Sequence, residues 1–531
     1  MTAASSPAPE LGATDRSALG RALLPALALY AVLAWQLDFL CDDAFISFRY
    51  ARNLAEGHGL RFNLAADPPV EGYSNFLWVL LLGTLHGLGI DIVVASRVLS
   101  ALCGAALVAV ITSLARRRLE LSPAGTLATA LFAATLPPTA LWATGGLATM
   151  PVALFVALAF ERLVGDPERP HGWQAGIFAA LAALTRADGV AWGLMLLGSA
   201  FLAWLGSGRE RAFLVAGLRA FTVLTLAVGA HFAWRLGYYG DYLPNTARVK
   251  AGFSEHRLDR GLDYVAATLL TVPAIPLALV LSMRGWRPST VRIWLPLLLT
   301  LLATLAYGAF VGGDFMPMGR FLFPAIALSP LFVALAWCRL ERLAERGAML
   351  LATGTLVILN VLGCFDLGVV PEGVIERFHF RQDRPWESEI SMRTSMDGRA
   401  REWMTLGHAL ALHTEPGETM VAGPIGAKSF YTELDYFDIY GLVSPEVIGA
   451  ATPSERSSPG HDLRVDYSFF NEHRPTYMGA FLSRVDAPES DQVGDWSRFA
   501  SFARLERYPL RVEDGFEEGA ELRLVRFTSW D

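Results

Sequence analysis

The feature that most constrains this chain is a series of apolar runs, from residue 20 to residue 368, that are long enough to cross a bilayer. A helix needs about 20 mostly apolar residues to cross the hydrocarbon layer of roughly 30 Å. Backbone N–H and C=O groups cannot stay unpaired in lipid, so runs of this kind fold as helices. The composition agrees, because 53% of the residues are hydrophobic, 18% are charged and the mean hydropathy is +0.37. The sequence therefore predicts a polytopic α-helical membrane protein.

The positions of the arginines decide which apolar runs cross the membrane. Counting residues 73–90 as a span would put the arginines of 115–120 on the same side as the acids at 42 and 43. Cytoplasmic loops are enriched in Arg and Lys, so we interpret 73–90 as a helix lying at the interface. About eleven spans remain, near residues 20–40, 92–115, 122–138, 148–165, 172–185, 189–206, 211–234, 261–283, 293–311, 320–338 and 347–368.

With this assignment, arginine-bearing loops lie on one side of the membrane and clusters of mixed polar residues lie on the other. Every loop expected on the cytoplasmic side carries arginine: Arg116 to Arg118, Arg162, Arg169, Arg209, Arg211, Arg284, Arg287, Arg292, Arg339, Arg342 and Arg346. The external side receives clusters of Asp, Arg, Asn and Tyr, for example "DDAFISFRYARN", "LTRADG" and "VGGDFMPMGRFLFP". A structural protein has no reason to gather such residues on one face, whereas an enzyme or a transporter with a site there does.

Changes of composition divide the chain into three parts. Residues 1–19, rich in Ala, Ser and Pro, read as a disordered tail, and residues 20–368 form the membrane module. Residues 369–531 alternate helical stretches such as "RAREWMTLGHALALH" with short apolar strands such as "TMVAG" and "YFDIYG", which predicts a soluble α/β domain. The four cysteines lack metal-type spacing, and no basic tract suggests a nucleic-acid partner.

Two adjacent acids open a short external helix, predicted over residues 42–57. Asp42, Arg49 and Asn53 share one face of this helix, and seven residues at about 1.5 Å each separate Asp42 from Arg49 by about 10 Å. This spacing suits a carboxylate at a reacting hydroxyl and a guanidinium at a phosphate. The alternative is that Asp42 and Asp43 only cap the helix, because acids in a first turn favour the helix dipole.

Several motifs in order resemble the glycosyltransferase C superfamily of polytopic membrane enzymes. They are "DDAFISFRYARNLAEGHGLRFN", "PPVEGYSNFLW", "YYGDYLPNTARVK" and "VGGDFMPMGRFLFP", and within the superfamily they are most similar to the branch that contains the mycobacterial terminal arabinofuranosyltransferase. The likeness covers residues 20–340. In the tail, Asp438, Gly441 and Leu442 match an Asp-x-x-Gly-Leu pattern of the same branch.

The resemblance implies transfer of a sugar, arabinofuranose in the named relative, from a polyprenyl phosphate to a hydroxyl of a glycan, lipid or protein acceptor. It places the enzyme in the bacterial cytoplasmic (inner) membrane, with the site and the tail on the external, periplasmic side. The acidic pair supplies a general base at Asp42, with Asp43 orienting it or binding metal. Candidates for the donor phosphate are Arg49, Arg248, Lys250 and Arg320, and candidates for substrate contact are Tyr50, Asn53, Glu71, Arg186, Tyr239, Asn245 and Asp314.

Other interpretations of these residues stay open in the sequence. Arg186 and Asp188 could neutralise each other, Arg320 could extend to the interface, the tyrosines could be interfacial anchors and Glu71 could cap a helix. Two acids and a phosphate can coordinate Mg²⁺ or Mn²⁺, yet cationic side chains can do the same work, so no cofactor is certain.

Two other functions compete with the enzyme. A transporter of lipid-linked sugars would spread its polar residues along the spans, whereas here they gather at one face. A non-catalytic binding member of the same fold is suggested by Ala148, which stands in "GGLATM" where many relatives carry Glu after Gly-Leu. The intact acidic pair favours the enzyme.

Overall fold

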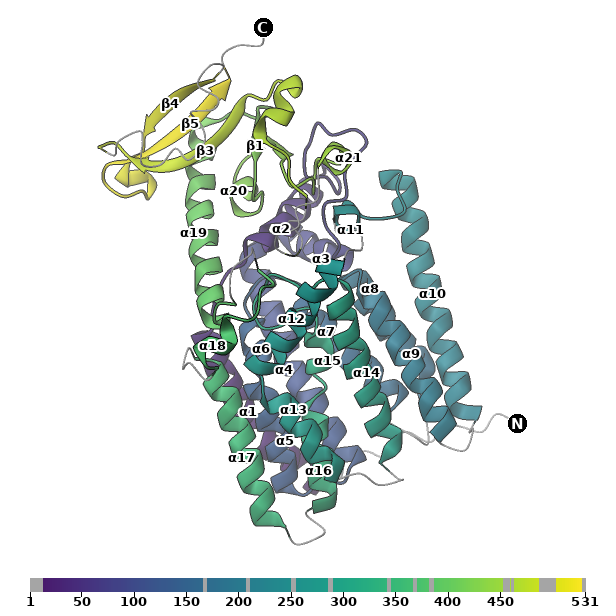
Figure 1. The fold of residues 1–531 in the computed structure, drawn as a ribbon. Coiled ribbons are helices and arrows are strands. Elements are labelled where there is room, and N and C mark those ends of the chain that lie inside the picture. Colours follow the sequence, from purple (N-terminus) through teal and green to yellow (C-terminus); the bar gives the residue numbers. More distant parts are fainter. Residues whose placement is uncertain are drawn as a thin grey trace.

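The computed structural model describes residues 13–165, 170–206, 211–249, 255–284, 290–340, 345–365, 370–381, 386–451, 459, 463–486 and 503–527. It is a long helical bundle with a small sheet domain at one end (Figure 1). The helices of the bundle are α1 (Ala13–Gln36), α2 (Asp42–Ala55), α3 (Phe76–Gly87), α4 (Ile92–Arg118), α5 (Pro123–Thr135), α6 (Pro137–Leu141), α7 (Thr149–Leu163), α8 (Gly172–Thr185), α9 (Gly189–Gly206), α10 (Arg211–Tyr239), α11 (Asn245–Val249), α12 (Glu255–Thr271), α13 (Ala274–Arg284), α14 (Val291–Phe310), α15 (Phe323–Ile326), α16 (Pro330–Leu340) and α17 (Arg346–Gly363).

Six helices of the described chain are long and apolar enough to cross a membrane, and a bent pair makes a seventh candidate. The pair is α12 and α13, which meet at an angle of 75°. Every segment that the sequence predicts as a span contains a helix, but some of these helices, such as α8, are shorter than a full crossing. The predicted membrane fold is confirmed, while the total of about eleven crossings stays a prediction.

Small residues let α8 and α10 approach closely. A Cβ added at Gly172 would lie 2.2 Å from the carbonyl oxygen of Ala216, and one at Gly176 would lie 2.8 Å from that of Ala220. Glycines four residues apart lie on the same side of a helix. Small residues in this pattern commonly let membrane helices pack closely. This contact positions α8, whose C-terminal end carries Arg186.

Two short helices lie where the sequence predicts external helices, and both pack near the tail-bearing end of the bundle (Figure 1). Helix α2 begins at Asp42 and buries Phe45, Phe48 and Tyr50, whereas α3 packs against it. The start of the chain differs from expectation, because α1 begins at Ala13 and so includes part of the segment 1–19 that we expected to be disordered.

The tail forms a five-stranded sheet in the order β2-β1-β3-β5-β4. The strands are β1 (Thr419–Ala422), β2 (Asp435–Asp438), β3 (Tyr477–Arg484), β4 (Ala503–Pro509) and β5 (Ala520–Phe527). Strand β1 is parallel to β2 and β3, while β5 is antiparallel to β3 and β4. The tail helices are α18 (Glu372–Ile375), α19 (Glu389–His413), α20 (Ala427–Phe430) and α21 (Glu446–Ala450), with 3-10 turns at Tyr467–His473 and Val512–Asp514.

Helix α20 docks the tail directly onto α2. The Arg49 guanidinium on α2 is completely buried and donates to the carbonyl oxygens of Phe62 (2.8 Å), Ser429 (2.7 Å) and Leu434 (2.5 Å). It also lies over the rings of Phe62 and Tyr436, at 4.5 and 5.3 Å. One side chain of α2 therefore ties the membrane module to two segments of the tail.

Candidate active site

A cavity of about 190 Å³ lies where the membrane module meets the tail. Its walls come from the start of α2, the segment 72–75, the turn before α7, the C-terminal end of α8, the segments around Thr246 and Arg320, and two loops of the tail. The polar and charged residues that line it are Asp42, Asp43, Ser47, Tyr73, Ser74, Asn75, Thr149, Arg186, Thr246, Arg320, Asp438 and Tyr440. The sequence predicted a site at this end of the bundle, and the cavity brings four of the predicted residues together: Asp42, Asp43, Arg186 and Arg320.

The tail holds one oxygen of the Asp42 carboxylate. The backbone N–H of Ala427 donates to Asp42 Oδ1 over 2.6 Å, and Gly426 packs against the same aspartate. A Cβ added at Gly426 would lie 2.1 Å from the backbone oxygen of Asp42 and 2.5 Å from its Oδ1. This close approach therefore requires glycine at 426, and it leaves Oδ2 as the carboxylate oxygen that Ala427 does not engage.

Burial, backbone amides and two charged groups set the ionisation of Asp42. Burial raises the pKa of Asp42 to about 7, although the Ala427 amide and Lys428 oppose the rise and Asp43 adds to it. Burial lowers the pKa of Lys428 to about 8, against the attraction of Asp42 and Asp438. Burial also raises the pKa of Asp438 to about 6, although the amides of Tyr440 and Leu442 stabilise its charged form. The carboxylate side of the cavity thus includes a group poised near neutral pH, as a general base requires.

Two arginines also line the cavity. Arg320 Nε donates to Asp314 Oδ2 over 2.6 Å and its guanidinium makes a second bond to Oδ1 at 3.2 Å. Asp43 also interacts electrostatically with Arg320. Arg186 forms a two-point ion pair with Asp188, with Nε 2.7 Å from Oδ1. Each arginine is therefore oriented by its own carboxylate, and both line the cavity.

Three predicted site residues of α2 do not line this cavity. The guanidinium of Arg49 donates its hydrogen bonds to backbone carbonyls. The Tyr50 hydroxyl donates to the Val70 carbonyl at 2.7 Å and accepts from the Gly72 amide at 2.8 Å. Asn53 donates to the carbonyl of Arg61 at 2.8 Å. These residues are fully buried and hold the segment 61–72 in place, so their geometry does not fit the phosphate or substrate contacts predicted for them.

A second, larger cavity of about 690 Å³ receives another group of predicted residues: Glu71, Tyr239, Asn245 and Arg248. Glu71 pairs with Arg235 at 2.7 Å, Arg248 pairs with Asp241 at 2.5 Å, and the Tyr239 hydroxyl donates to the Leu60 carbonyl at 2.9 Å. Asn245 donates to the carbonyls of Gly441 and Leu442, at 2.6 and 2.9 Å. Arg248 therefore lies at the second cavity rather than at the first, and Lys250 lies outside the described residues.

Asp314 lies behind the cavity wall as the partner of Arg320, and it is almost fully buried. Asp314 itself does not line the cavity, so its predicted contact with substrate stays a prediction. Among the described residues, no three His, Cys, Asp or Glu side chains are arranged to hold a metal ion. Asp42 and Asp43 are two carboxylates that could contribute to a metal site completed by substrate oxygens.

Sequence reasoning did not assign a site role to Lys428, Asp438 or Thr149. Lys428 was noticeable only as one of the two lysines of the chain, and Asp438 only through its Asp-x-x-Gly-Leu pattern. Both lie almost 400 residues from Asp42 along the chain, so no local pattern connects them to it. Their position in the structure depends on how the tail docks, which short-range periodicity does not report.

Comparisons with known proteins agree with this architecture. A curated relative, the terminal beta-(1->2)-arabinofuranosyltransferase of Mycobacterium tuberculosis (strain ATCC 25618 / H37Rv), is 29% identical over 285 residues, which are 49% of this chain and 43% of the relative. Less than half of that relative's length is therefore matched. The resemblance to glycosyltransferase C enzymes that the sequence predicts is confirmed.

Solved structures extend the likeness to nearly the whole chain. The apo crystal structure of ArnT from Cupriavidus metallidurans gives a TM-score of 0.54 at 14% identity, covering 97% of this chain and 98% of ArnT. The same protein bound to undecaprenyl phosphate gives 0.52, with coverage of 98% and 99%. The cryo-EM structure of arabinofuranosyltransferase AftD from Mycobacteria gives 0.52 at 18% identity, covering 96% of this chain and 40% of AftD. Residues 389–519 also match the family described as Domain of unknown function (DUF8728).

Proposed function

We propose that this protein is a membrane glycosyltransferase that moves a sugar from a polyprenyl phosphate to the hydroxyl of a cell-envelope acceptor. The observation that carries the proposal is one cavity, at the end of a membrane bundle, that is lined by both the acidic pair and two arginines held by their own carboxylates. The ArnT fold, solved with undecaprenyl phosphate, and the arabinofuranosyltransferase relative support this choice of donor class. Arabinofuranose is the first sugar to test.

In this proposal Asp42 is the general base of a single displacement. Its Oδ2 accepts the proton of the acceptor hydroxyl while that oxygen attacks the anomeric carbon of the sugar. The bond between the anomeric carbon and the phosphate oxygen breaks, and the polyprenyl phosphate leaves with the electron pair. A base is most effective when its pKa is near the working pH, so the raised pKa of Asp42 suits this role.

The leaving phosphate gains negative charge as the bond breaks, and fixed cations on its side of the cavity stabilise that charge. Arg186 and Arg320 are held by Asp188 and Asp314, so they need little reorganisation during the reaction. Preorganised charges of this kind act more strongly in a cavity that excludes water than in bulk solvent. The same two arginines give the donor phosphate a binding site before the reaction starts.

The second cavity is the proposed approach of the acceptor. It shares a wall with the first, because Gly72 and Leu442 line one cavity whereas Glu71 and Val443 line the other. Its lining combines carboxylates with the rings of Tyr239, Tyr436 and Phe437. Such groups bind sugar hydroxyls and pack on sugar faces. An external, periplasmic position fits this scheme, because the arginine-rich loops predict that the opposite end faces the cytoplasm.

The test is a transfer assay with the purified protein in lipid nanodiscs. A panel of radiolabelled polyprenyl phosphate sugars, including arabinofuranose, is offered together with envelope glycan acceptors. We expect a labelled product with one donor and none with the corresponding nucleotide sugar. Absence of product with every donor, together with movement of the donor across the bilayer, would replace this proposal with a transporter of lipid-linked sugars.

A further inference from the structure

We propose that the N-terminus of α7, with Thr149 and Arg186, is the site that binds the phosphate of the lipid donor. The inference rests on the proposed function and deepens it, because it assigns the phosphate to a helix end and to a hydroxyl that no sequence motif indicated. It also gives a physical meaning to Ala148, which is the N-cap residue of this helix. The ligand chemistry is a phosphate ester at the membrane surface.

The start of α7 offers a positive helix end to the cavity. The helix has 15 residues, and Leu147, Ala148 and Thr149 at its start all line the cavity. Ala148 is the N-cap residue, and no side chain caps the helix. The first N–H groups of a helix have no partner within the helix, and the aligned peptide dipoles place partial positive charge there. An uncapped helix start at a cavity is a favourable site for an anion.

Two buried polar atoms beside this helix end point independently to a ligand. Among the described residues, Thr149 Oγ1 and Arg186 Nη1 have no hydrogen-bond partner. Thr149 is 1% exposed and Arg186 is 9% exposed, and both residues line the cavity. A buried donor without a partner costs free energy, so natural structures seldom leave one unused. A phosphate oxygen between them would accept from both, while the other guanidinium nitrogens keep their bonds to Asp188.

Ala148 keeps this helix end free for the phosphate. A glutamate at 148 would place a negative charge at the N-cap, where it would repel a phosphate and compete for the free N–H groups of Thr149 and Met150, since Pro151 at the third position has no N–H. The alanine side chain offers neither an acceptor nor a charge. In this chain the phosphate therefore takes the position at the helix start that an acidic side chain would otherwise occupy.

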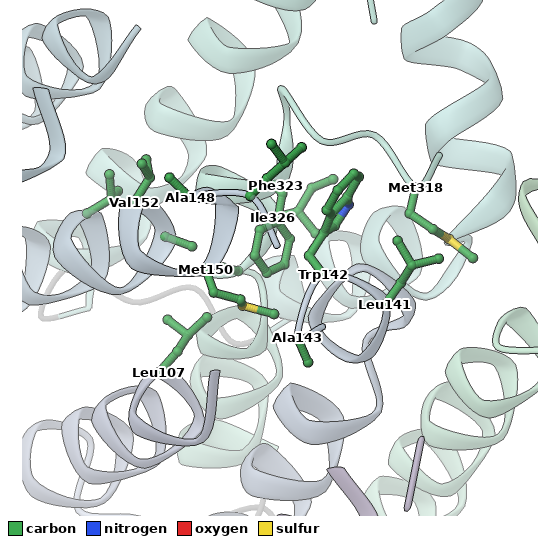
Figure 2. Packing of buried hydrophobic residues seen from close by; sticks show 14 of the residues in the cluster. Leu107, Leu141, Trp142, Ala143, Ala148, Met150, Val152, Met318, Phe323 and Ile326 are labelled. Carbon is green, nitrogen blue, oxygen red and sulfur yellow. The ribbon is translucent and has the colours of Figure 1, made fainter. Parts of the chain in front are cut away.

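The helix start is held firmly by packing on its other faces. Figure 2 shows the N-cap residue Ala148, with Met150 and Val152 of α7, in the same buried cluster as Trp142, Phe323 and Ile326. All of them belong to the continuous buried core of the membrane module. Because well-packed side chains resist displacement, the donors at the helix start keep their positions whether or not the phosphate is bound.

The inference is tested by binding of polyprenyl phosphate to the full-length protein in nanodiscs, measured separately from transfer. Ala148→Glu is compared with Ala148→Gln, which has nearly the same size without the charge. Thr149→Val is compared with Thr149→Ser, which keeps the hydroxyl. We expect Glu to weaken binding clearly more than Gln. Loss of a hydrogen bond to a charged group predicts about 10- to 100-fold weaker binding for Val, with Ser close to the unmodified protein.

Binding of polyprenol and of inorganic phosphate is measured as well, to show whether the site recognises the phosphate of a lipid or free phosphate. Weak binding of polyprenol, with the same affinity in all four variants, supports a site for the phosphate of a lipid. Tight binding of inorganic phosphate alone, with no gain from the lipid, would indicate a site for free phosphate. Equal polyprenyl phosphate affinity in the Glu and Gln variants and no loss in Thr149→Val would overturn the inference, even if transfer continues. Phosphate binding that responds as expected, without transfer by the unmodified protein, would instead overturn the proposed function.

Discussion

At the scale of single residues, the proposed chemistry depends on the environment of Asp42. Its Oδ1 is held by the Ala427 amide, and its charge is influenced by Asp43 next to it and by Lys428 of the tail. A carboxylate held at one oxygen can present the other to a hydroxyl in a constant direction, which is the geometric requirement of a general base. The acidic pair pointed to this residue, which lines the cavity, but no local pattern indicated the tail groups that act on it.

The ionisation of Asp42 predicts the pH dependence of transfer. A base acts in its ionised form, and the pKa of Asp42 is raised to about 7 by burial. The rate of transfer should therefore fall as the pH decreases through about 7, which is well above the range of an ordinary aspartate. The measurement is kcat/KM for the acceptor between pH 5 and pH 9. A flat profile down to pH 5 would contradict a base with a raised pKa at this position.

Removing the positive charge of Lys428 should move this profile in a defined direction. Lys428 lowers the pKa of Asp42, so Lys428→Met should raise that pKa. The fall of kcat/KM on the acidic side of the profile should then begin at higher pH. Lys428→Arg keeps the charge, so kcat/KM should fall near the same pH as in the unmodified protein. A loss of activity that is uniform across the pH range in both variants would indicate a structural role only.

Arg49 shows how a helix face can suggest a contact that the tertiary structure does not make. Its position seven residues after Asp42 fits a phosphate contact, yet the structure uses it to bond three carbonyls between α2 and the tail. Arg49→Gln should therefore cost stability, by about 3 kcal/mol or more, because buried carbonyls lose a charged donor.

The measurement for Arg49→Gln is thermal unfolding in detergent, with donor affinity determined below the transition. Arg401→Gln is the control, since Arg401 lies on the tail surface with Asp397 as partner, and such pairs contribute about 1 kcal/mol or less. Unchanged thermal stability with a large loss of donor affinity would restore Arg49 to the phosphate site.

At the scale of elements, the contact between α2 and the tail segment before α20 assembles the carboxylate side of the cavity. Gly426 approaches Asp42 so closely that a methyl group has no room. Helical periodicity predicted α2, and apolar runs predicted β1 and β2. The contact itself joins segments far apart in sequence, so it depends on how the tail docks rather than on any local pattern.

Gly426→Ala should therefore lower transfer strongly while the bundle stays folded. The added methyl group would push the Ala427 amide away from Asp42, so the base would lose its orientation. Gly398→Ala in α19 is the matched control, because nothing lies within 4 Å of a Cβ at that position. The measurement is the transfer rate of both variants, together with thermal unfolding to establish that their stability is equal. Equal rates would show that the tail does not position Asp42.

At the scale of the whole molecule, the sequence predicted what depends on local patterns and on the sorting of charge. Apolar runs indicated the membrane helices, and the arginine-rich loops indicated the end at which the site would lie. The cavity itself combines residues from Asp42 to Leu442, and most of the predicted binding residues hold loops or lie at a second cavity. Such an assembly follows from tertiary packing, which no single segment encodes.

The measurement that tests the central claim most directly compares Asp42→Asn with the unmodified protein, for both sugar transfer and donor binding in nanodiscs. Loss of the general base predicts a rate about 10²- to 10⁴-fold lower. Donor affinity should be nearly unchanged, because Arg186, Arg320 and the start of α7 remain in place. Transfer at the original rate would contradict the account, and a parallel loss of donor binding would show that Asp42 holds the donor rather than activating the acceptor.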